Sequence, residues 1–257
     1  MSIDVEISSG ICTITINRPE RMNAMDHEHY RDLSQAWCRV RDDAEIRVAI
    51  ITGAGSKSFT AGADIKSFLT GPPAYDEMWL TQRDLLLNRG LDVWKPVIAA
   101  VNGYCLGGGM TLLLATDIRF AAPKATFGLA EVKRGVVPGN GGTQRILHQL
   151  PHPIAMEMLL TGDSIDAQTA ARWGLVNQVV DAGQLMTVAN ECAERIAANA
   201  PLAVQAAKEL ALRSRDLDLA SGLRLEQVTN RMLMATEDAS EGPAAFAEKR
   251  PARFKGR

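Results

Sequence analysis

The chain has 257 residues, of which 46% are hydrophobic and 23% are charged, and its formal net charge is -2. That length can bury a substantial core in one large domain, with room for a helical appendage. The nearly balanced charge argues against a general nucleic-acid-binding protein, which would carry a basic excess, although it is compatible with a local basic pocket for a phosphorylated small molecule.

The beginning of the chain and its cysteines indicate a protein of a reducing compartment. Residues 2–7 alternate polar and apolar side chains, with no basic start and no long apolar run, so we expect neither a signal peptide nor a membrane span. The four cysteines are scattered and predict no disulfide framework and no zinc site. They are Cys12, Cys38, Cys105 and Cys192. The histidines also lack metal-ligand spacing, and we expect a cytoplasmic protein without a metal.

Short apolar segments, separated by turn residues and helical patterns, predict an α/β fold. Residues 11–16 alternate apolar and small polar side chains, and residues 27–40 carry apolar side chains at helical spacing. Residues 48–52 and 97–101 are continuous apolar runs, which are typical of strands buried on both faces of a parallel sheet. Further strands are expected at residues 118–121 and 174–180. No G-x-G-x-x-G motif follows the first strand, so the dinucleotide-binding version of such a fold is not expected.

From about residue 184 the composition changes to Ala, Glu, Lys and Leu, and Pro201 stands where a helix can start. We therefore divide the chain into an α/β core, residues 1–190, and a C-terminal helical region, residues 191–257. The segment Gly-Pro-Pro-Ala-Tyr-Asp-Glu-Met-Trp, residues 71–79, predicts a flexible loop that covers a site.

A first glycine turn follows the strand at residues 48–52. In Ser-Phe-Thr-Ala-Gly-Ala-Asp-Ile, residues 58–65, Gly62 permits backbone conformations that other residues resist. The amide of Ala63 is then available to an anion. An ordinary tight loop explains the same residues.

A second glycine turn, residues 107–109, lies between an expected strand and an expected helix. Unpaired amides and the positive end of the helix dipole point outward at such a position. Two amides that converge on one oxygen form an oxyanion hole. Close packing of the helix on the sheet would also require glycine here.

Glu131 is the candidate acid/base. It lies in Phe-Gly-Leu-Ala-Glu-Val, residues 127–132, with apolar neighbours on both sides. A carboxylate in apolar surroundings has a raised pKa, which suits proton transfer. The alternative is a surface carboxylate that pairs with Lys133 or Arg134.

With these motifs, the sequence resembles the crotonase, or enoyl-CoA hydratase/isomerase, superfamily from the Asn-Arg-Pro of residues 17–19 to Lys255. The motifs that carry the resemblance are residues 61–66, 102–109, 127–131 and 138–145, the last reading Pro-Gly-Asn-Gly-Gly-Thr-Gln-Arg. Residues 47–55 and 241–250 are especially similar to carnitinyl-CoA dehydratases.

The resemblance implies a crotonase-like spiral of ββα units whose C-terminal helices build a homotrimer, commonly stacked into a hexamer. It implies an acyl-CoA substrate, a place in fatty acid metabolism, and no cofactor beyond the coenzyme A moiety. The lid residues Tyr75, Met78 and Trp79 would then line the acyl pocket. No nucleic-acid or membrane partner is expected.

The resemblance also assigns site residues. The backbone amides of Ala63 and Gly108 are expected to hold the thioester carbonyl oxygen. Phe246 and Lys249 are expected to close the site of a neighbouring subunit. The other residues expected to contact coenzyme A are Arg21, Met22, Ala24, Ala61, Asp64, Ile65 and Lys66.

Thr111 is the departure from this pattern. Two-glutamate hydratases place a carboxylate three residues after the central glycine of the second turn, and this chain has Thr111 there. A threonine hydroxyl can hold a water but is a poor general base near neutrality, so Glu131 must carry the proton transfers. We favour a hydratase or dehydratase in which Thr111 orients the water. The alternatives are a Δ3-Δ2 enoyl-CoA isomerase with Glu131 as single proton shuttle and a non-catalytic acyl-CoA binding protein.

Overall fold

Two β-sheets frame the computed structural model, which describes residues 2–68 and 84–257. The larger sheet has the order β1-β2-β3-β5-β7-β10, and within it only the β1–β2 pair is antiparallel. The smaller sheet has the order β4-β6-β8-β9, with β9 antiparallel to β8. The strands are β1 (Ile3–Ser8), β2 (Ile11–Ile16), β3 (Val48–Gly53), β4 (Ser58–Thr60), β5 (Val97–Val101), β6 (Tyr104–Leu106), β7 (Ile118–Ala121), β8 (Thr126–Gly128), β9 (Ile165–Asp166) and β10 (Gln178–Val179).

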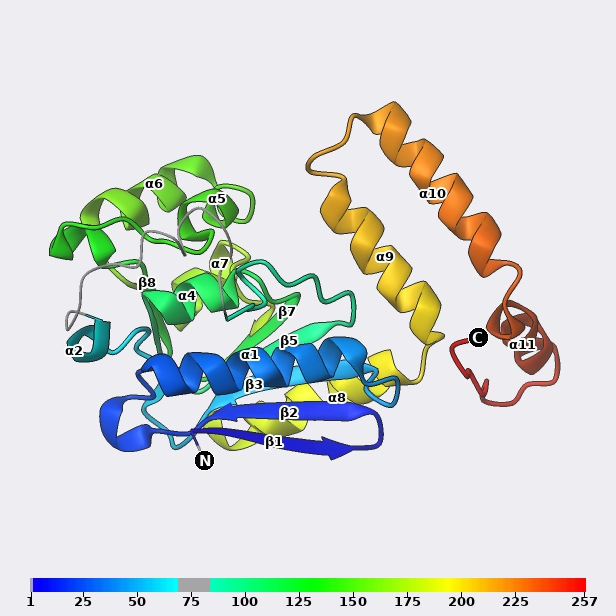
Figure 1. Ribbon diagram of the computed structural model, residues 1–257, viewed down its shortest axis with the longest axis horizontal. Helices are drawn as coiled ribbons and strands as arrows, with labels where there is room; N and C mark the ends of the chain where they lie inside the picture. The colour runs from blue at the N-terminus through cyan, green and yellow to red at the C-terminus, as the bar shows by residue number, and fades with distance from the viewer. Residues whose placement is uncertain (1, 69–83) are drawn as a thin grey trace.

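The described helices connect and cover these strands (Figure 1). The α-helices are α1 (His27–Asp42), α2 (Ile65–Phe68), α4 (Gly108–Leu113), α5 (Gly142–Ile146), α6 (His152–Thr161), α7 (Ala167–Arg172), α8 (Leu185–Ala197), α9 (Pro201–Arg213), α10 (Leu219–Leu233) and α11 (Glu237–Ala247). Short 3₁₀-helices are η1 (Pro19–Arg21), η2 (Glu131–Arg134) and η3 (Ala182–Gln184). None of the helices described here is long and apolar enough to cross a membrane.

The chain is a spiral of repeated units. Three times in succession it adds a strand to the larger sheet, then a strand to the smaller sheet, and then a helical segment: β3-β4-α2, β5-β6-α4 and β7-β8-η2. The expected fold of ββα units is thereby confirmed. Because strands of the smaller sheet run parallel from β4 to β8, the segments that follow them emerge at the same edge.

The central strands β3 and β5 of the larger sheet are buried on both faces, as their apolar runs predict. Every residue of β3 and β5 is buried. Alternate residues of β3 enter different core clusters: Ala49 and Ile51 pack with Trp37 of α1, whereas Val48 and Ile50 pack with residues of α8. A strand that buries both faces has no reason to alternate polar and apolar residues.

The strand expected at residues 174–180 is wrong for most of its length. Only Gln178–Val179 pair with β7. Gly174 has a φ of +76° and donates its N–H to the Ala171 carbonyl at 3.1 Å, so the chain turns there. Leu175 and Val176 are buried in the core without pairing as a strand.

The C-terminal helices α9, α10 and α11 extend away from the sheets (Figure 1). No residue of α9 or α10 is buried. The α9 helix is tied to the core by Lys208, whose Nζ lies 2.6 Å from Asp117 Oδ2, and by Arg213, which stacks 5.3 Å from the ring centre of Trp94. The α8 helix continues across residue 190 and packs on the larger sheet, and the division into two domains at that residue stays a prediction.

Candidate active site

The loop before α1 is fixed against the first glycine turn by polar contacts. Arg18 Nη1 lies 3.0 Å from Asp64 Oδ2 and donates to the Ala24 carbonyl at 3.2 Å. Asn23, which is fully buried, donates its side-chain amide to the Ser58 carbonyl at 2.7 Å. These contacts place the coenzyme A residues expected between positions 21 and 24 beside those expected between positions 61 and 66.

A short β-bridge between Met25 and Ala63 leaves the Ala63 amide unused. The Met25 N–H donates to the Gly62 carbonyl, and the Asp64 N–H donates to the Met25 carbonyl, both at 2.8 Å. Ala63 is exposed, and its own N–H donates to no acceptor within residues 2–68 and 84–257. This amide is therefore available to a ligand.

The second glycine turn touches the first. A side chain at Gly62 would place its Cβ atom 2.7 Å from the Gly108 nitrogen, and one at Gly108 would place its Cβ atom 3.5 Å from the Ala63 nitrogen. Gly107 has a φ of +53°, and it turns the chain from β6 into α4. The Gly108 N–H, at the start of α4, also has no acceptor in the described part of the chain. The structure thus brings together the two amides that were expected to form the oxyanion hole.

Glu131 lies next to this pair of amides. A Cβ atom at Gly107 would be 3.5 Å from Glu131 Oε1, while Oε2 is buried and has no hydrogen-bond partner in the described part of the chain. Burial raises the pKa of this carboxyl above its ordinary value. Glu131 forms no ion pair with Lys133 or Arg134 in the part of the chain that the structure describes: Lys133 Nζ lies 2.5 Å from Asp163 Oδ1, and Arg134 donates to the Ala130 carbonyl, although its positive charge lowers the pKa of Glu131 in opposition to burial.

Thr111 is committed to structural hydrogen bonds. Its side chain is buried on α4, and its hydroxyl donates to the Gly108 carbonyl at 2.9 Å. The same oxygen accepts a hydrogen bond from Asn88 Nδ2 at 3.2 Å. One lone pair of the hydroxyl remains, so Thr111 can accept a further hydrogen bond but has no proton left to offer.

Tyr30 is a site residue that the sequence does not reveal. It lies in the segment of residues 27–40, which was expected only to carry apolar side chains at helical spacing, but a Cβ atom at Gly108 would lie 2.9 Å from its phenol oxygen. Burial raises the pKa of Tyr30 to about 12, with Arg89 lowering it and Glu131 raising it. Tertiary packing alone brings this phenol to Gly108, and no local sequence signal marks it.

The remaining expected residues fall in three places. Lys66 is exposed on α2, close to Ala63 in the chain. Phe246, which is 87% exposed, and Lys249 belong to the α11 end of the molecule, far from α2 and α4 (Figure 1), so one chain does not bring them to the site. The expected lid residues Tyr75, Met78 and Trp79 lie outside the described residues.

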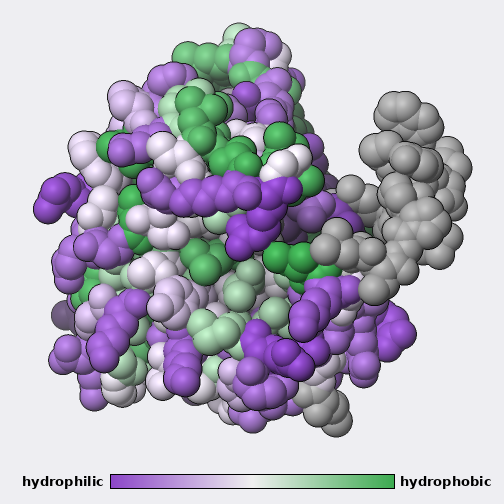
Figure 2. All heavy atoms as spheres, turned by 90° about the vertical axis from the view of Figure 1, so that its left-hand side faces the viewer, coloured by the Kyte–Doolittle hydropathy of each residue, from purple (hydrophilic) through white to green (hydrophobic). Residues whose placement is uncertain are grey.

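The face that carries α2 and α6 shows hydrophobic side chains in its upper part and weakly polar and hydrophobic ones across its middle, while hydrophilic side chains prevail toward the bottom (Figure 2). Large apolar side chains follow both halves of the candidate site in the chain: Ile65 is 47% exposed, and Val136 and Val137 are 59% and 71% exposed. Within residues 2–68 and 84–257, no group of His, Cys, Asp and Glu side chains is arranged to hold a metal ion. Exposed apolar side chains therefore stand next in the chain to both halves of the candidate site.

Comparisons with known proteins match the whole chain. The sequence profile of the family described as enoyl-CoA hydratase/isomerase matches residues 6–257. The (E)-benzylidenesuccinyl-CoA hydratase of Thauera aromatica is 43% identical over 259 residues, which cover 100% of both chains. The carnitinyl-CoA dehydratase of Proteus mirabilis is 41% identical over 260 residues, covering 100% of this chain and 99% of the relative. The crystal structure of an enoyl-CoA hydratase from Bacillus anthracis is similar with a TM-score of 0.91 at 36% identity, covering 100% of both chains.

Proposed function

The chain belongs to the enoyl-CoA hydratase/isomerase family, also called the crotonase family, and we propose that it hydrates an enoyl-CoA thioester or catalyses the reverse dehydration. The observation that carries the proposal is the contact between the turns of Gly62 and Gly108, which brings two free amides together beside the Glu131 carboxylate. Relatives 43% and 41% identical along the whole chain are a hydratase and a dehydratase of CoA thioesters, which supports this reaction class.

The two amides act on the thioester carbonyl. The N–H groups of Ala63 and Gly108 donate to its oxygen, which becomes negatively charged when an enolate forms. Because both donors are fixed by the backbone before the substrate arrives, they stabilise this charge without reorganising. One such donor is typically worth about 2.7–4 kcal/mol in the transition state.

Glu131 moves the proton. As a carboxylate it takes a proton from the water that attacks C3 of the enoyl group, and the electron pair of the double bond moves into the enolate. Glu131 then returns the proton to C2, so that one water is added across the double bond. Dehydration is the same sequence reversed. A raised pKa brings the carboxyl closer to the working pH and so improves both transfers.

The hydrogen bond that the Thr111 hydroxyl donates to the Gly108 carbonyl favours a second candidate function. Because its proton is donated to the Gly108 carbonyl, Thr111 offers no second acid. Δ3-to-Δ2 isomerisation needs only one shuttling group: Glu131 takes a proton from C2 and delivers it to C4 of the same enolate. Isomerisation also needs no bound water.

A paired assay with crotonyl-CoA and a 3-enoyl-CoA, run beside Glu131→Gln, tests the proposal. Hydration removes the conjugated thioester absorbance of crotonyl-CoA, and the substitution should abolish this loss. A gain of conjugation from the 3-enoyl thioester, with crotonyl-CoA untouched, would assign the isomerase. If both thioesters bind and neither reacts, benzylidenesuccinyl-CoA and carnitinyl-CoA are the next substrates, and inertness toward all four would leave a non-catalytic acyl-CoA binding protein.

We also propose that the protein is a homotrimer, or a hexamer of two trimers, in which Phe246 and Lys249 close the site of a neighbouring subunit. The support is that α9 and α10 bury no residue within the chain and expose large apolar side chains. Leu219 is 77% exposed, and Met232 and Met234 are each 70% exposed. A light-scattering mass of three or six chains is expected, and a monomer would contradict this assembly.

We propose further that the coenzyme A moiety of the substrate is the only cofactor and that the protein is cytoplasmic. The loop of residues 18–26 and the exposed Lys66 support coenzyme A binding beside Ala63. The cysteines of the chain are all free, which supports a reducing compartment. Turnover of the purified protein after dialysis against a chelator, with no added cofactor, tests the first statement.

A further inference from the structure

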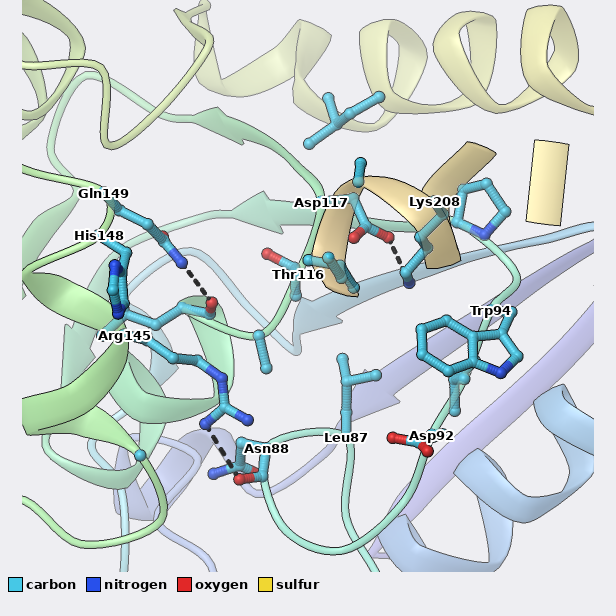
Figure 3. A pocket seen from close by; sticks show the side chains of 18 of the residues that line it. Leu87, Asn88, Asp92, Trp94, Thr116, Asp117, Arg145, His148, Gln149 and Lys208 are labelled. Atoms are coloured by element: carbon cyan, nitrogen blue, oxygen red, sulfur yellow. Dashed lines mark hydrogen bonds and ion pairs between the residues drawn. The ribbon is translucent and has the colours of Figure 1, made fainter. Parts of the chain in front are cut away.

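A cavity of about 1280 Å³ lies between α9 and the loop of residues 87–96 (Figure 3). Three acidic residues line it, Asp92, Asp117 and Asp216. Twice as many basic residues line it: Arg89, Arg119, Arg145, Lys208, Arg213 and Arg215. Of these, only Lys208 and Arg213 form an ion pair with a carboxylate in the described part of the chain. The cavity therefore carries an excess of positive charge that the surrounding residues do not neutralise.

The pKa values of two lining arginines reflect this excess. Burial lowers the pKa of the Arg145 guanidinium, and the positive charge of Arg215 lowers it further. Burial also lowers the pKa of Arg119 to about 10, and Arg215 contributes to the same shift against the opposing effect of Asp117. An apolar acyl tail in this cavity would desolvate these cations and give them no counter-charge, which is unfavourable.

The cavity adjoins the candidate active site through Asn88. Arg145 Nη1 donates to the backbone carbonyl of Asn88 at 3.2 Å (Figure 3). The Asn88 side chain in turn donates to Thr111, which holds the Gly108 carbonyl. One wall of the cavity is thus bonded to the helix that provides an oxyanion donor.

Arg89 is the cation best placed to bind a substrate. Its Nη2 donates to the Asp84 carbonyl at 2.9 Å, but its Nε is buried and has no hydrogen-bond partner among residues 2–68 and 84–257. The positive charge of Arg89 lowers the pKa of Tyr30, whose phenol oxygen lies beside Gly108. Two backbone hydrogen bonds between Leu86 and Arg89, each 2.8 Å, fix this part of the loop. A buried donor without a partner is destabilising, and a ligand anion that accepts from it would remove that cost.

We propose, on the premise that the chain acts on CoA thioesters as proposed above, that the acyl group of its substrate carries a carboxylate and that Arg89 binds it. The guanidinium is a planar fork of donors that matches the two oxygens of a carboxylate. The phosphates of coenzyme A are the other source of negative charge. They are expected near α2, which lies far from α9 in Figure 1.

The affinity ratio between two unreactive thioesters tests the proposal. Glutaryl-CoA and pentanoyl-CoA have the same five-carbon chain, and only the first ends in a carboxylate, so the coenzyme A phosphates cancel in the comparison. Titration calorimetry of the intact protein should show glutaryl-CoA binding at least about tenfold more tightly, as a charge-assisted contact of about 1.5–3 kcal/mol implies. Arg89→Gln should bring the ratio close to one, and Arg89→Lys should restore part of it.

Arg41→Gln, on an exposed arginine paired with Asp42 at the far end of α1, is the matched control and should keep the wild-type ratio. The oligomeric mass and melting temperature of each variant verify that it is folded. A wild-type ratio of one or less, or an unchanged ratio in Arg89→Gln, would overturn the carboxylate proposal. Failure of both thioesters to bind the wild type would instead contradict the proposed function on which it rests.

Discussion

The sheets with α1 and α8 differ from the helices α9 to α11 in how far the chain itself buries their apolar side chains. In the core, both faces of β3 and β5 are covered by the chain itself. In the C-terminal helices, α9 and α10 bury nothing, and Phe246 of α11 is almost fully exposed. The proposed catalytic groups come from the region that buries its own apolar residues. The proposed contacts with a second copy come from the helices that leave theirs exposed.

The largest expected effect is a loss in the free energy of unfolding when a core side chain is truncated, compared with a truncation in the exposed helices. Trp37→Ala removes a fully buried indole from the cluster between α1 and the larger sheet. Such a truncation typically costs about 3–5 kcal/mol in the free energy of unfolding. Leu219→Ala, at a residue 77% exposed in the single chain, should cost less, because its side chain loses few contacts within its own chain. Urea denaturation of both variants measures their free energies of unfolding. Equal losses of free energy in the two variants would contradict the distinction between the core and the exposed helices.

Gly108→Pro should cause the next largest effect by deleting one oxyanion donor. The substitution places proline at the first position of α4, where helices accept it. Loss of the donor should reduce kcat by roughly 100- to 1000-fold. Gly108→Ala is the matched control, because it adds the same Cβ atom beside Tyr30 but keeps the N–H. If both variants turn over substrate equally, the Gly108 amide is not an oxyanion donor.

Lys249→Ala tests whether the exposed C-terminal end of the chain contributes to substrate binding. If Lys249 closes a neighbour's site, its loss should weaken thioester binding by roughly tenfold, the equivalent of about 1.4 kcal/mol, and change kcat little. Lys124→Ala, another exposed lysine, is the control. An unchanged KM and dissociation constant in the Lys249 variant would show that the exposed end of the chain does not complete the site.

The smallest expected effect is the pH dependence of the stability that the folded protein loses by burying the Glu131 carboxyl. Burial raises its pKa in the folded protein, so the unfolded chain loses this proton at a lower pH than the folded chain does. Stability from this group is therefore full below the unfolded pKa and decreases as pH rises through the folded pKa. The melting temperature of Glu131→Gln should exceed that of the wild type by more at pH 7 than at pH 4. A difference that shrinks with rising pH would contradict the assigned environment.

The sequence predicted the parts of the fold that depend on local patterns. The expected bounds of β2 and β7 agree with the structure, and the continuous apolar runs of β3 and β5 correctly indicated burial on both faces. Residues 174–180 were misassigned because Leu175 and Val176 are buried after a turn, which an apolar run does not distinguish from a strand.

The candidate site was predictable only where a motif marks it. The glycine turns and Glu131 are visible in the sequence, although their approach to one another comes from the parallel strands that precede them. Tyr30 and Asn88 had no such mark, because packing of α1 and of the loop after residue 84 alone places them beside Gly108 and Thr111. The structure also shows that the Thr111 hydroxyl accepts a hydrogen bond from Asn88 and donates one to the Gly108 carbonyl. The residue type alone does not show this.

The most direct test of the central claim is to measure turnover and thioester binding side by side in the wild type and Glu131→Gln, with Glu157→Gln on the exposed face of α6 as control. If Glu131 moves the proton, the substitution should lower kcat by roughly 100- to 10,000-fold. The dissociation constant of an unreactive thioester should stay within about threefold, because the amide of glutamine fills the same space. Turnover by Glu131→Gln at the wild-type rate would contradict the account.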